Sequence, residues 1–132
     1  MTQRKTSEEL NELTEMVIGA AIQVHRTLGP GLLESVYSEC LAIELADCGL
    51  HALREVTIPI TYKNINVNNA YRLDFIIEDD LIVECKTVEL LLPIHSAQVL
   101  TYLKVTGKRL GLLINFNVEI LHKGIKRIAN GI

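Results

Sequence analysis

Apolar residues recur every three or four positions through the first quarter of the chain, which is the spacing of an amphipathic helix. The recurrent positions are Leu10, Leu13, Val17, Ala20 or Ala21, Val24 and Leu28. Thr6 and Glu9 have the spacing of a capping box at the helix start, and Gly29-Pro30 predicts its end. A second helix is predicted over residues 32–48, because Gly49 suits the position just after a helix.

The pattern then changes to that of strands. Residues 56–62 are predicted to form a strand, in which Pro59 favours a sheet edge or a bulge. Residues 63–70 have the polar chemistry of a turn, although Ile65 and Val67 leave open a longer strand. The remaining predictions are a hairpin over residues 71–86, a helix over 94–106, a buried strand over 110–116, and a tail at 119–128 that fits a short strand or a short helix.

The hairpin joins two apolar runs through the acidic residues 78–80. A three-residue loop centred on Asp79 sets the register, which pairs Ile77 with Leu81, Phe75 with Val83 and Asp74 with Glu84. Because side chains alternate along a strand, Glu84 and Lys86 share one face. Val83 and Cys85 point the other way and should pack under a helix, with Leu112 and Ile114 extending that core in a neighbouring strand.

Two carboxylates and one ammonium group therefore converge on one face of the hairpin. Like charges directly opposite across an antiparallel pair are destabilising, and a divalent cation would remove that repulsion. Magnesium is commonly held by one or two carboxylates plus waters. The alternative is a solvated strand face on which Lys86 simply neutralises Asp74 and Glu84.

Asp74 and Glu84-Cys85-Lys86 resemble the signature of the PD-(D/E)XK nucleases, with the degenerate first half that is usual in that superfamily. Upstream, Gly31, Glu34 and Tyr37 match the motif of its GxxExxY family. The opening segment at residues 24–31 and the stretches at 98–102 and 112–116 are also similar to that family. The resemblance covers residues 13–130, and the order of the motifs is more specific than any one of them.

The resemblance implies a single α/β domain over residues 1–132, with a restriction-endonuclease-like core of a mixed four- to five-stranded sheet flanked by helices. It implies a magnesium-dependent nuclease, with manganese as a second option. Asp74, Glu84 and the Cys85 carbonyl would hold the metal. Lys86 would orient the attacking water or stabilise charge on the phosphate. Further candidates are Glu34 and Gln98 near the reacting groups and, for substrate binding, Arg72, Tyr37, Tyr102 and His95.

Composition agrees with a compact globular domain, since 48% of residues are hydrophobic and 22% are charged. No apolar run approaches the ~20 residues of a membrane span, so no membrane partner is expected. Cys40, Cys48 and Cys85 are odd in number and lack zinc-type spacing. These features predict a cytoplasmic protein with reduced thiols.

Net charge is −3, yet residues 101–132 hold six basic side chains and one acidic one. That basic end either contacts the phosphates of a nucleic acid or forms ordinary solvated faces. The expected partner is nucleic acid, with DNA and RNA both open, and a homodimer is allowed. The second function, from another class, is a catalytically silent module that binds nucleic acid or protein on the same fold.

Overall fold

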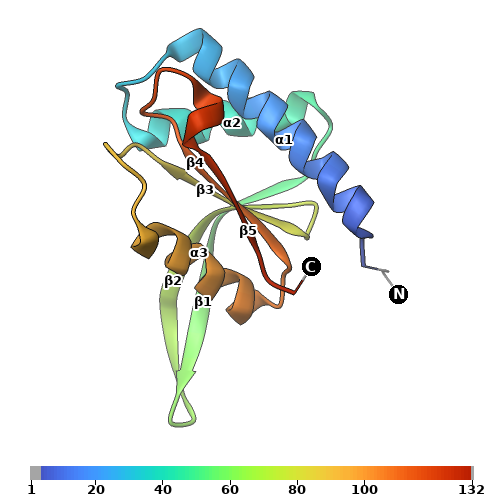
Figure 1. Cartoon of the computed structure of the whole chain (residues 1–132). Helices are drawn as coiled ribbons and strands as arrows, with labels where there is room; N and C mark the ends of the chain where they lie inside the picture. The colour runs from blue at the N-terminus through green and yellow to red at the C-terminus, as the bar shows by residue number, and fades with distance from the viewer. Residues whose placement is uncertain (1–3, 132) are drawn as a thin grey trace.

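A computed structural model describes residues 4–131, so residues 1–3 and 132 of the expected domain lie outside it. Residues 4–131 form one mixed five-stranded sheet and three α-helices (Figure 1). In chain order the elements are α1 (Ser7–Leu28), α2 (Glu34–Asp47), β1 (Ala52–Tyr62), β2 (Ile65–Ile77), β3 (Leu81–Lys86), α3 (Pro93–Thr106), β4 (Leu110–Asn115), the 3-10 helix η1 (Leu121–Gly124) and β5 (Ile125–Ala129).

The first helix starts as its sequence predicts. The Thr6 hydroxyl accepts from the Glu9 N–H, and the Glu9 carboxylate accepts from the Thr6 N–H, each at 3.1 Å. These bonds satisfy two of the N–H groups that a helix start leaves without partners. Gly29 ends the helix with φ of 71°, a left-handed value that glycine adopts at little cost.

The strands follow the order β1-β2-β3-β4-β5, and only β3 and β4 run parallel. The predicted hairpin register is confirmed for three pairs, Phe75 with Val83, Ile76 with Ile82, and Ile77 with Leu81. The loop is the predicted three residues, 78–80. The expected restriction-endonuclease-like α/β architecture is therefore present, with five strands.

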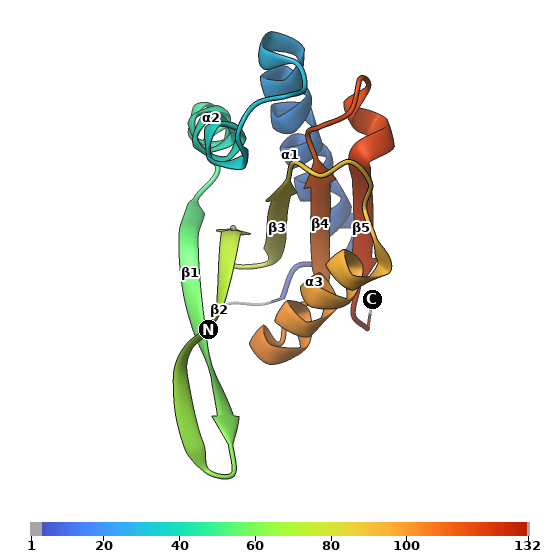
Figure 2. The same cartoon turned by 90° about the vertical axis from the view of Figure 1, so that its left-hand side faces the viewer.

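Helices α1 and α2 cover one face of the sheet and α3 covers the other (Figure 2). Val83 and Cys85 lie in the core beneath α1 and α2, together with Leu112 and Ile114, as expected. The α3 side has its own core, in which Ile82 and Leu113 pack against Leu103. Among residues 4–131, no helix is both long and apolar enough to cross a bilayer.

Strands β1 and β2 are longer than predicted and form a projecting arm (Figures 1 and 2). Only Lys63 and Asn64 make the turn, so the residues after them continue as strand. Both have positive φ, at 49° and 63°. Pro59 lies on the edge strand at a shift of register between Ile58 and Ile60, in agreement with the predicted edge or bulge. The ambiguous tail resolves into both alternatives, η1 followed by β5.

Candidate functional site

The site is built where β2 and β3 part. Beyond the Phe75–Val83 pair, the two carboxylates replace the backbone carbonyls as hydrogen-bond acceptors. The Asp74 N–H donates to Glu84 Oε1 at 2.8 Å, and the Cys85 N–H donates to Asp74 Oδ2 at 2.8 Å. The predicted register pair of Asp74 with Glu84 is not formed, because the strands part after Phe75 and Val83. The two residues are linked instead by reciprocal side-chain bonds to the backbone of the opposite strand.

A local irregularity in β1 lies opposite Asp74. Arg54 pairs with Phe75 and Val56 with Leu73, but no pair joins Glu55 to Asp74. Glu55 has φ of 51°, a costly value for a residue other than glycine. Leu73 and Phe75 should share a face, yet Leu73 joins the α3-side core and Phe75 the α1/α2-side core. The strand therefore changes face at Asp74.

Arg72 forms an ion pair with Glu55, the residue at this irregularity. Its guanidinium lies 2.5 Å from Glu55 Oε1, and both side chains are exposed. Arg72 also lowers the pKa of Asp74, as a minor contribution. Arg72 therefore pairs with Glu55 and lies within electrostatic reach of Asp74, while substrate binding by Arg72 stays a prediction.

Burial dominates the electrostatics of the carboxylate pair. Glu84 is only 4% exposed. Its burial, with a further contribution from the Asp74 carboxylate, raises the pKa of Glu84 to about 8. Burial also raises the pKa of Asp74, against the lowering effects of the Cys85 N–H and the Lys86 ammonium. At neutral pH and without a cation, the pair therefore retains a proton.

Glu34 approaches from the first position of α2. It lines a cavity of about 140 Å³ together with Asp74, Arg54 and Arg72. Partial desolvation and the Asp74 carboxylate raise the pKa of Glu34, whereas Lys86 lowers it. Glu34 in turn contributes to the raised pKa of Glu84. The expectation that α2 aims Glu34 at the pair is consistent with these couplings.

Lys86 ends β3 and is half-buried. Its ammonium lowers the pKa of Glu34, Asp74 and Glu84, so it lies within electrostatic reach of all three. The Lys86 carbonyl accepts from the Phe116 N–H at 2.9 Å, which extends the parallel ladder beyond Asn115.

Asn115 is a supporting residue that the sequence analysis did not single out. It is 2% exposed and pairs in register with Lys86. Its Oδ1 accepts from the Val88 N–H at 3.1 Å and its Nδ2 donates to the Val88 carbonyl at 2.9 Å. An asparagine ending an apolar strand was the only available signal, because these bonds link positions 27 residues apart. Asn115 thus anchors the backbone of the segment that follows Lys86 in the chain.

Tyr102 lies on α3, in the core on the face of the sheet that α3 covers, within electrostatic reach of Glu84 and Asp74. The Tyr102 side chain is 5% exposed, and its ring meets Tyr71 edge-on at 5.6 Å between centroids. Burial and then the Glu84 and Asp74 carboxylates raise the pKa of Tyr102 to about 12. Gln98, one turn earlier, is exposed. The His95 Nδ1 accepts from the Leu92 N–H at 2.9 Å, so its ring caps the start of α3.

Tyr37 does not suit the substrate-binding role considered for it. Its side chain is fully buried and stacks on Phe116, with 4.6 Å between ring centroids. Its hydroxyl donates to the Gly29 carbonyl at 2.5 Å and accepts from the Leu32 N–H at 3.2 Å. Tyr37 therefore fixes the turn before α2, because a fully buried ring has no surface to offer a substrate.

The basic C-terminal quarter is partly occupied by contacts within the chain. Lys108 forms an ion pair with Asp79 at 3.2 Å. Arg109 donates to the Lys5 carbonyl, and Arg127 donates to Asn11 Oδ1 at 2.6 Å. Half of the six basic side chains thus bind other parts of the chain, which favours the interpretation of these charges as ordinary surface contacts.

The donor set at the site is small. Among residues 4–131, no group of three or more His, Cys, Asp or Glu side chains is arranged to hold a metal ion. Asp74 and Glu84 therefore form a two-carboxylate site, with Glu34 nearby. Burial and Asp74 raise the pKa of the Cys85 thiol, so that thiol stays protonated at neutral pH. A surface hollow of about 570 Å³ lies between α1 and β5 and shares no lining residue with this site.

Comparison with known families agrees with this geometry. The family model described as PD-(D/E)XK nuclease superfamily matches residues 11–128. The chain belongs to the PD-(D/E)XK nuclease superfamily. The match spans both strands of the hairpin, α2, α3 and most of α1. No curated protein and no solved structure matches the chain.

Proposed function

We propose that this PD-(D/E)XK domain is a metal-dependent nuclease that hydrolyses phosphodiester bonds at Asp74, Glu84 and Lys86. The observation that carries the proposal is the buried carboxylate pair, whose raised pKa values report a cost of ionising both groups. Such perturbed groups gather at functional sites. A divalent cation would offset the cost of ionising both carboxyl groups.

The residues present fit magnesium, with manganese as a second option. Asp74 and Glu84 supply the hard oxygen donors that Mg²⁺ prefers, and its remaining positions are usually filled by water and substrate phosphate. The Cys85 carbonyl is the further donor we propose. A bound divalent cation would polarise the scissile phosphate and lower the pKa of an attacking water.

Lys86 would stabilise negative charge that develops on the phosphate, or hold the water in line. Glu34, with its raised pKa, is suited to exchange a proton with water on the α2 side. On the α3 side, the Tyr102 hydroxyl stays protonated and can donate a hydrogen bond. Gln98 and His95, also on α3, would contribute to the site, with Gln98 near the reacting groups and His95 in substrate binding. Arg72 would contact a neighbouring phosphate.

We also assign the chain to the GxxExxY branch of the superfamily. The bonds of Tyr37 to Gly29 and Leu32 give that motif a physical meaning. Gly31 has φ of 96°, which favours glycine. The tyrosine holds the turn, the glycine permits it, and Glu34 is thereby presented at the first position of α2. A cytoplasmic setting would keep the three free cysteines reduced.

The proposal is tested by titrating the wild-type protein with Mg²⁺ and Mn²⁺. A cation that binds the folded state must raise thermal stability. The same protein is then assayed on pooled DNA and RNA, single- and double-stranded, beside Lys86→Ala. We expect metal-dependent stabilisation and cleavage that Lys86→Ala lacks. If neither metal changes the melting temperature, the protein would instead be a catalytically silent binding module on this fold.

A further inference from the structure

The arm formed by residues 57–72 is the largest feature that the site does not explain. It projects from the sheet beyond α3, and all ten residues from 61 to 70 are exposed (Figures 1 and 2). An isolated two-stranded hairpin is marginal in water. The base of the arm packs against the α3-side core through Ile58 and Tyr71. The outer part, residues 61–70, is exposed throughout, so its length and composition call for a role outside the core.

The composition of the arm is unlike that of the rest of the chain. Residues 57–72 contain two basic residues, Lys63 and Arg72, and no aspartate or glutamate, although the whole chain has a net charge of −3. Four asparagines also lie there, at positions 64, 66, 68 and 69. The nearest acidic groups are at the base of the arm, where Glu55 is already paired with Arg72. With Arg72 paired to Glu55, the arm is an amide-rich projection whose remaining charge is the positive charge of Lys63 at the tip.

The arm has two different faces. The register pairs Thr61 with Asn66, and the flanking pairs Tyr62–Ile65 and Ile60–Val67 point to the opposite side. Asn68 shares the face of Asn66 by alternation. One face therefore offers hydroxyl and amide groups, while the other offers Tyr62 and Ile65, which are 63% and 67% exposed.

These features match the major groove of duplex DNA. That groove admits a two-stranded β-ribbon, and asparagine can bind the adenine edge that it exposes. Apolar side chains can contact thymine methyl groups there. The A-form major groove of duplex RNA is too deep and narrow for side chains to read. Charge complementarity to phosphates and ribbon geometry together favour duplex DNA as the partner.

The arm is also at a useful distance from the site. Asn64 and Asp74 lie on the same stretch of chain, ten residues apart. Strand β2 has two extra residues between Val67 and Tyr71 relative to β1, so β1 gives the better length. Its eight residues from Glu55 to Lys63 span roughly 26 Å at about 3.3 Å per residue, which is less than the ~34 Å of one helical turn of duplex DNA. We propose that the exposed part of the arm, residues 61–70, enters the major groove of duplex DNA within one helical turn of the phosphodiester held at Asp74 and Glu84. This inference rests on the proposed nuclease function.

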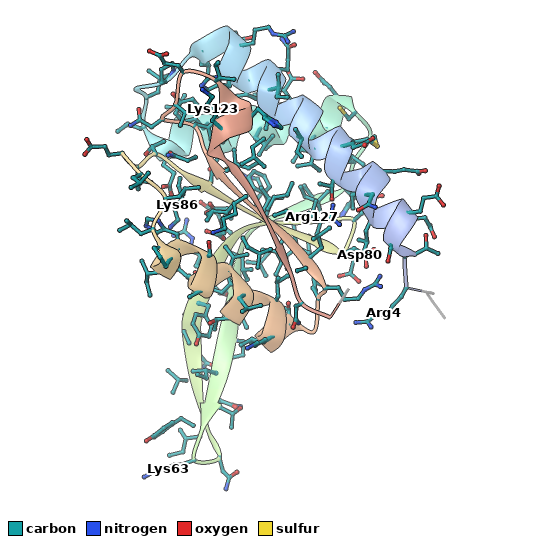
Figure 3. All side chains as sticks on the ribbon, viewed as in Figure 1. Arg4, Lys63, Asp80, Lys86, Lys123 and Arg127 are labelled. Atoms are coloured by element: carbon teal, nitrogen blue, oxygen red, sulfur yellow. The ribbon has the colours of Figure 1, made fainter. Side chains whose placement is uncertain are left out.

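The test measures binding of labelled DNA duplexes by fluorescence anisotropy in EDTA, where no metal-dependent cleavage occurs. Lys63→Glu reverses the charge at the tip, and Lys123→Glu makes the same change at the opposite end of the molecule (Figure 3). Both lysines are exposed. Lys63→Glu should weaken binding about fivefold or more and lower the slope of log K against log salt by about one. Lys123→Glu should change neither.

A second pair of variants controls for the possibility that Lys63→Glu weakens binding by disrupting the turn. Asn68→Asp adds a negative charge in the arm with almost no change of shape, and it lies outside the turn. Gln23→Glu makes the matched amide-to-acid change on α1. Equal melting temperatures show that the fold is intact. Asn68→Asp should weaken duplex binding, and Gln23→Glu should not.

Several results would overturn the arm assignment. These are equal losses for Lys63→Glu and Lys123→Glu, equal binding of an RNA duplex of the same sequence, or no binding of duplex DNA by the wild type. A dimer in solution that Ile65→Glu dissolves would identify a second copy as the occupant. Metal-dependent cleavage without dependence on the arm would reject this inference alone. Arm-dependent binding without cleavage would reject the nuclease function and leave a DNA-binding module.

Discussion

The Glu84 side chain accepts a hydrogen bond from the Asp74 N–H at 2.8 Å, although the two residues lie on different strands and both are acidic. The Asp74 carboxylate makes the complementary bond to the N–H of Cys85, next to Glu84. Each carboxylate thereby satisfies a backbone donor that the parting strands would leave unpaired. The pair is held in place by the fold before any cation binds.

Lys86→Ala should separate metal binding from catalysis. In the proposed site the carboxylates hold the cation and the ammonium does not, so stabilisation by Mg²⁺ should persist. Cleavage should fall by two to three decades, because loss of electrostatic stabilisation of a transition state typically costs ~3–4 kcal/mol. Asp74→Ala should lose both responses. Cleavage rates and melting curves with and without Mg²⁺ measure the two effects. Undiminished cleavage by purified Lys86→Ala would show that the chemistry lies elsewhere.

Glu84 should make the metal-free protein less stable as pH rises. Its pKa is raised from 4.5 to about 8 on folding, so between these values the folded state binds the proton and the unfolded state does not. The contribution of Glu84 to stability is therefore fully present below about pH 4.5 and is lost as pH rises through about 8. The slope is at most ~1.4 kcal/mol per pH unit.

Urea unfolding in EDTA across this pH range checks the prediction. Glu84→Gln should remove most of the slope, and saturating Mg²⁺ should flatten or reverse it, because a cation binds the ionised form. A wild-type protein whose stability rises between pH 5 and 8 in EDTA, with the same rise in Glu84→Gln, would contradict the raised pKa.

Asn115→Ala should destabilise the fold and impair cleavage together. The substitution leaves the Val88 N–H and carbonyl without their side-chain partner, at a cost of about 1–3 kcal/mol. Cleavage should fall even at temperatures where the variant is folded, because Val88 lies two residues after Lys86. Asn117→Ala is the matched control, since the Asn117 side chain is exposed and its change should stay within about 0.5 kcal/mol. Equal free energies of unfolding would count against the anchor.

Gly124→Ala should destabilise the protein by at least about 1–3 kcal/mol through overpacking. A Cβ at this position would lie 2.2 Å from the Asn115 carbonyl oxygen, which is backbone and cannot move aside cheaply. Gly19→Ala has open space around it within α1 and should stabilise the fold by about 0.5–1 kcal/mol. Chemical denaturation of both variants measures the contrast. Similar effects of the two alanines would contradict the close approach at Gly124.

The local parts of this protein were readable from its sequence. The capping box of Thr6 and Glu9, the end of α1 at Gly29 and the three-residue hairpin loop follow from neighbours within a few residues. Alternation along β3 placed Cys85 in the core and Glu84 on the opposite face. Each of these depends on short-range geometry, which a pattern of residue types records directly.

Tertiary structure decided the rest, because it depends on contacts between distant positions. The mutual burial of Asp74 and Glu84 raises their pKa values, and no sequence pattern states how deeply a strand end is buried. The full burial of Tyr37 requires Phe116, and the role of Asn115 requires Val88. The chemical groups of the site were predictable from the sequence, and the packing of α2 and α3 on the sheet determined which of these groups lie close together.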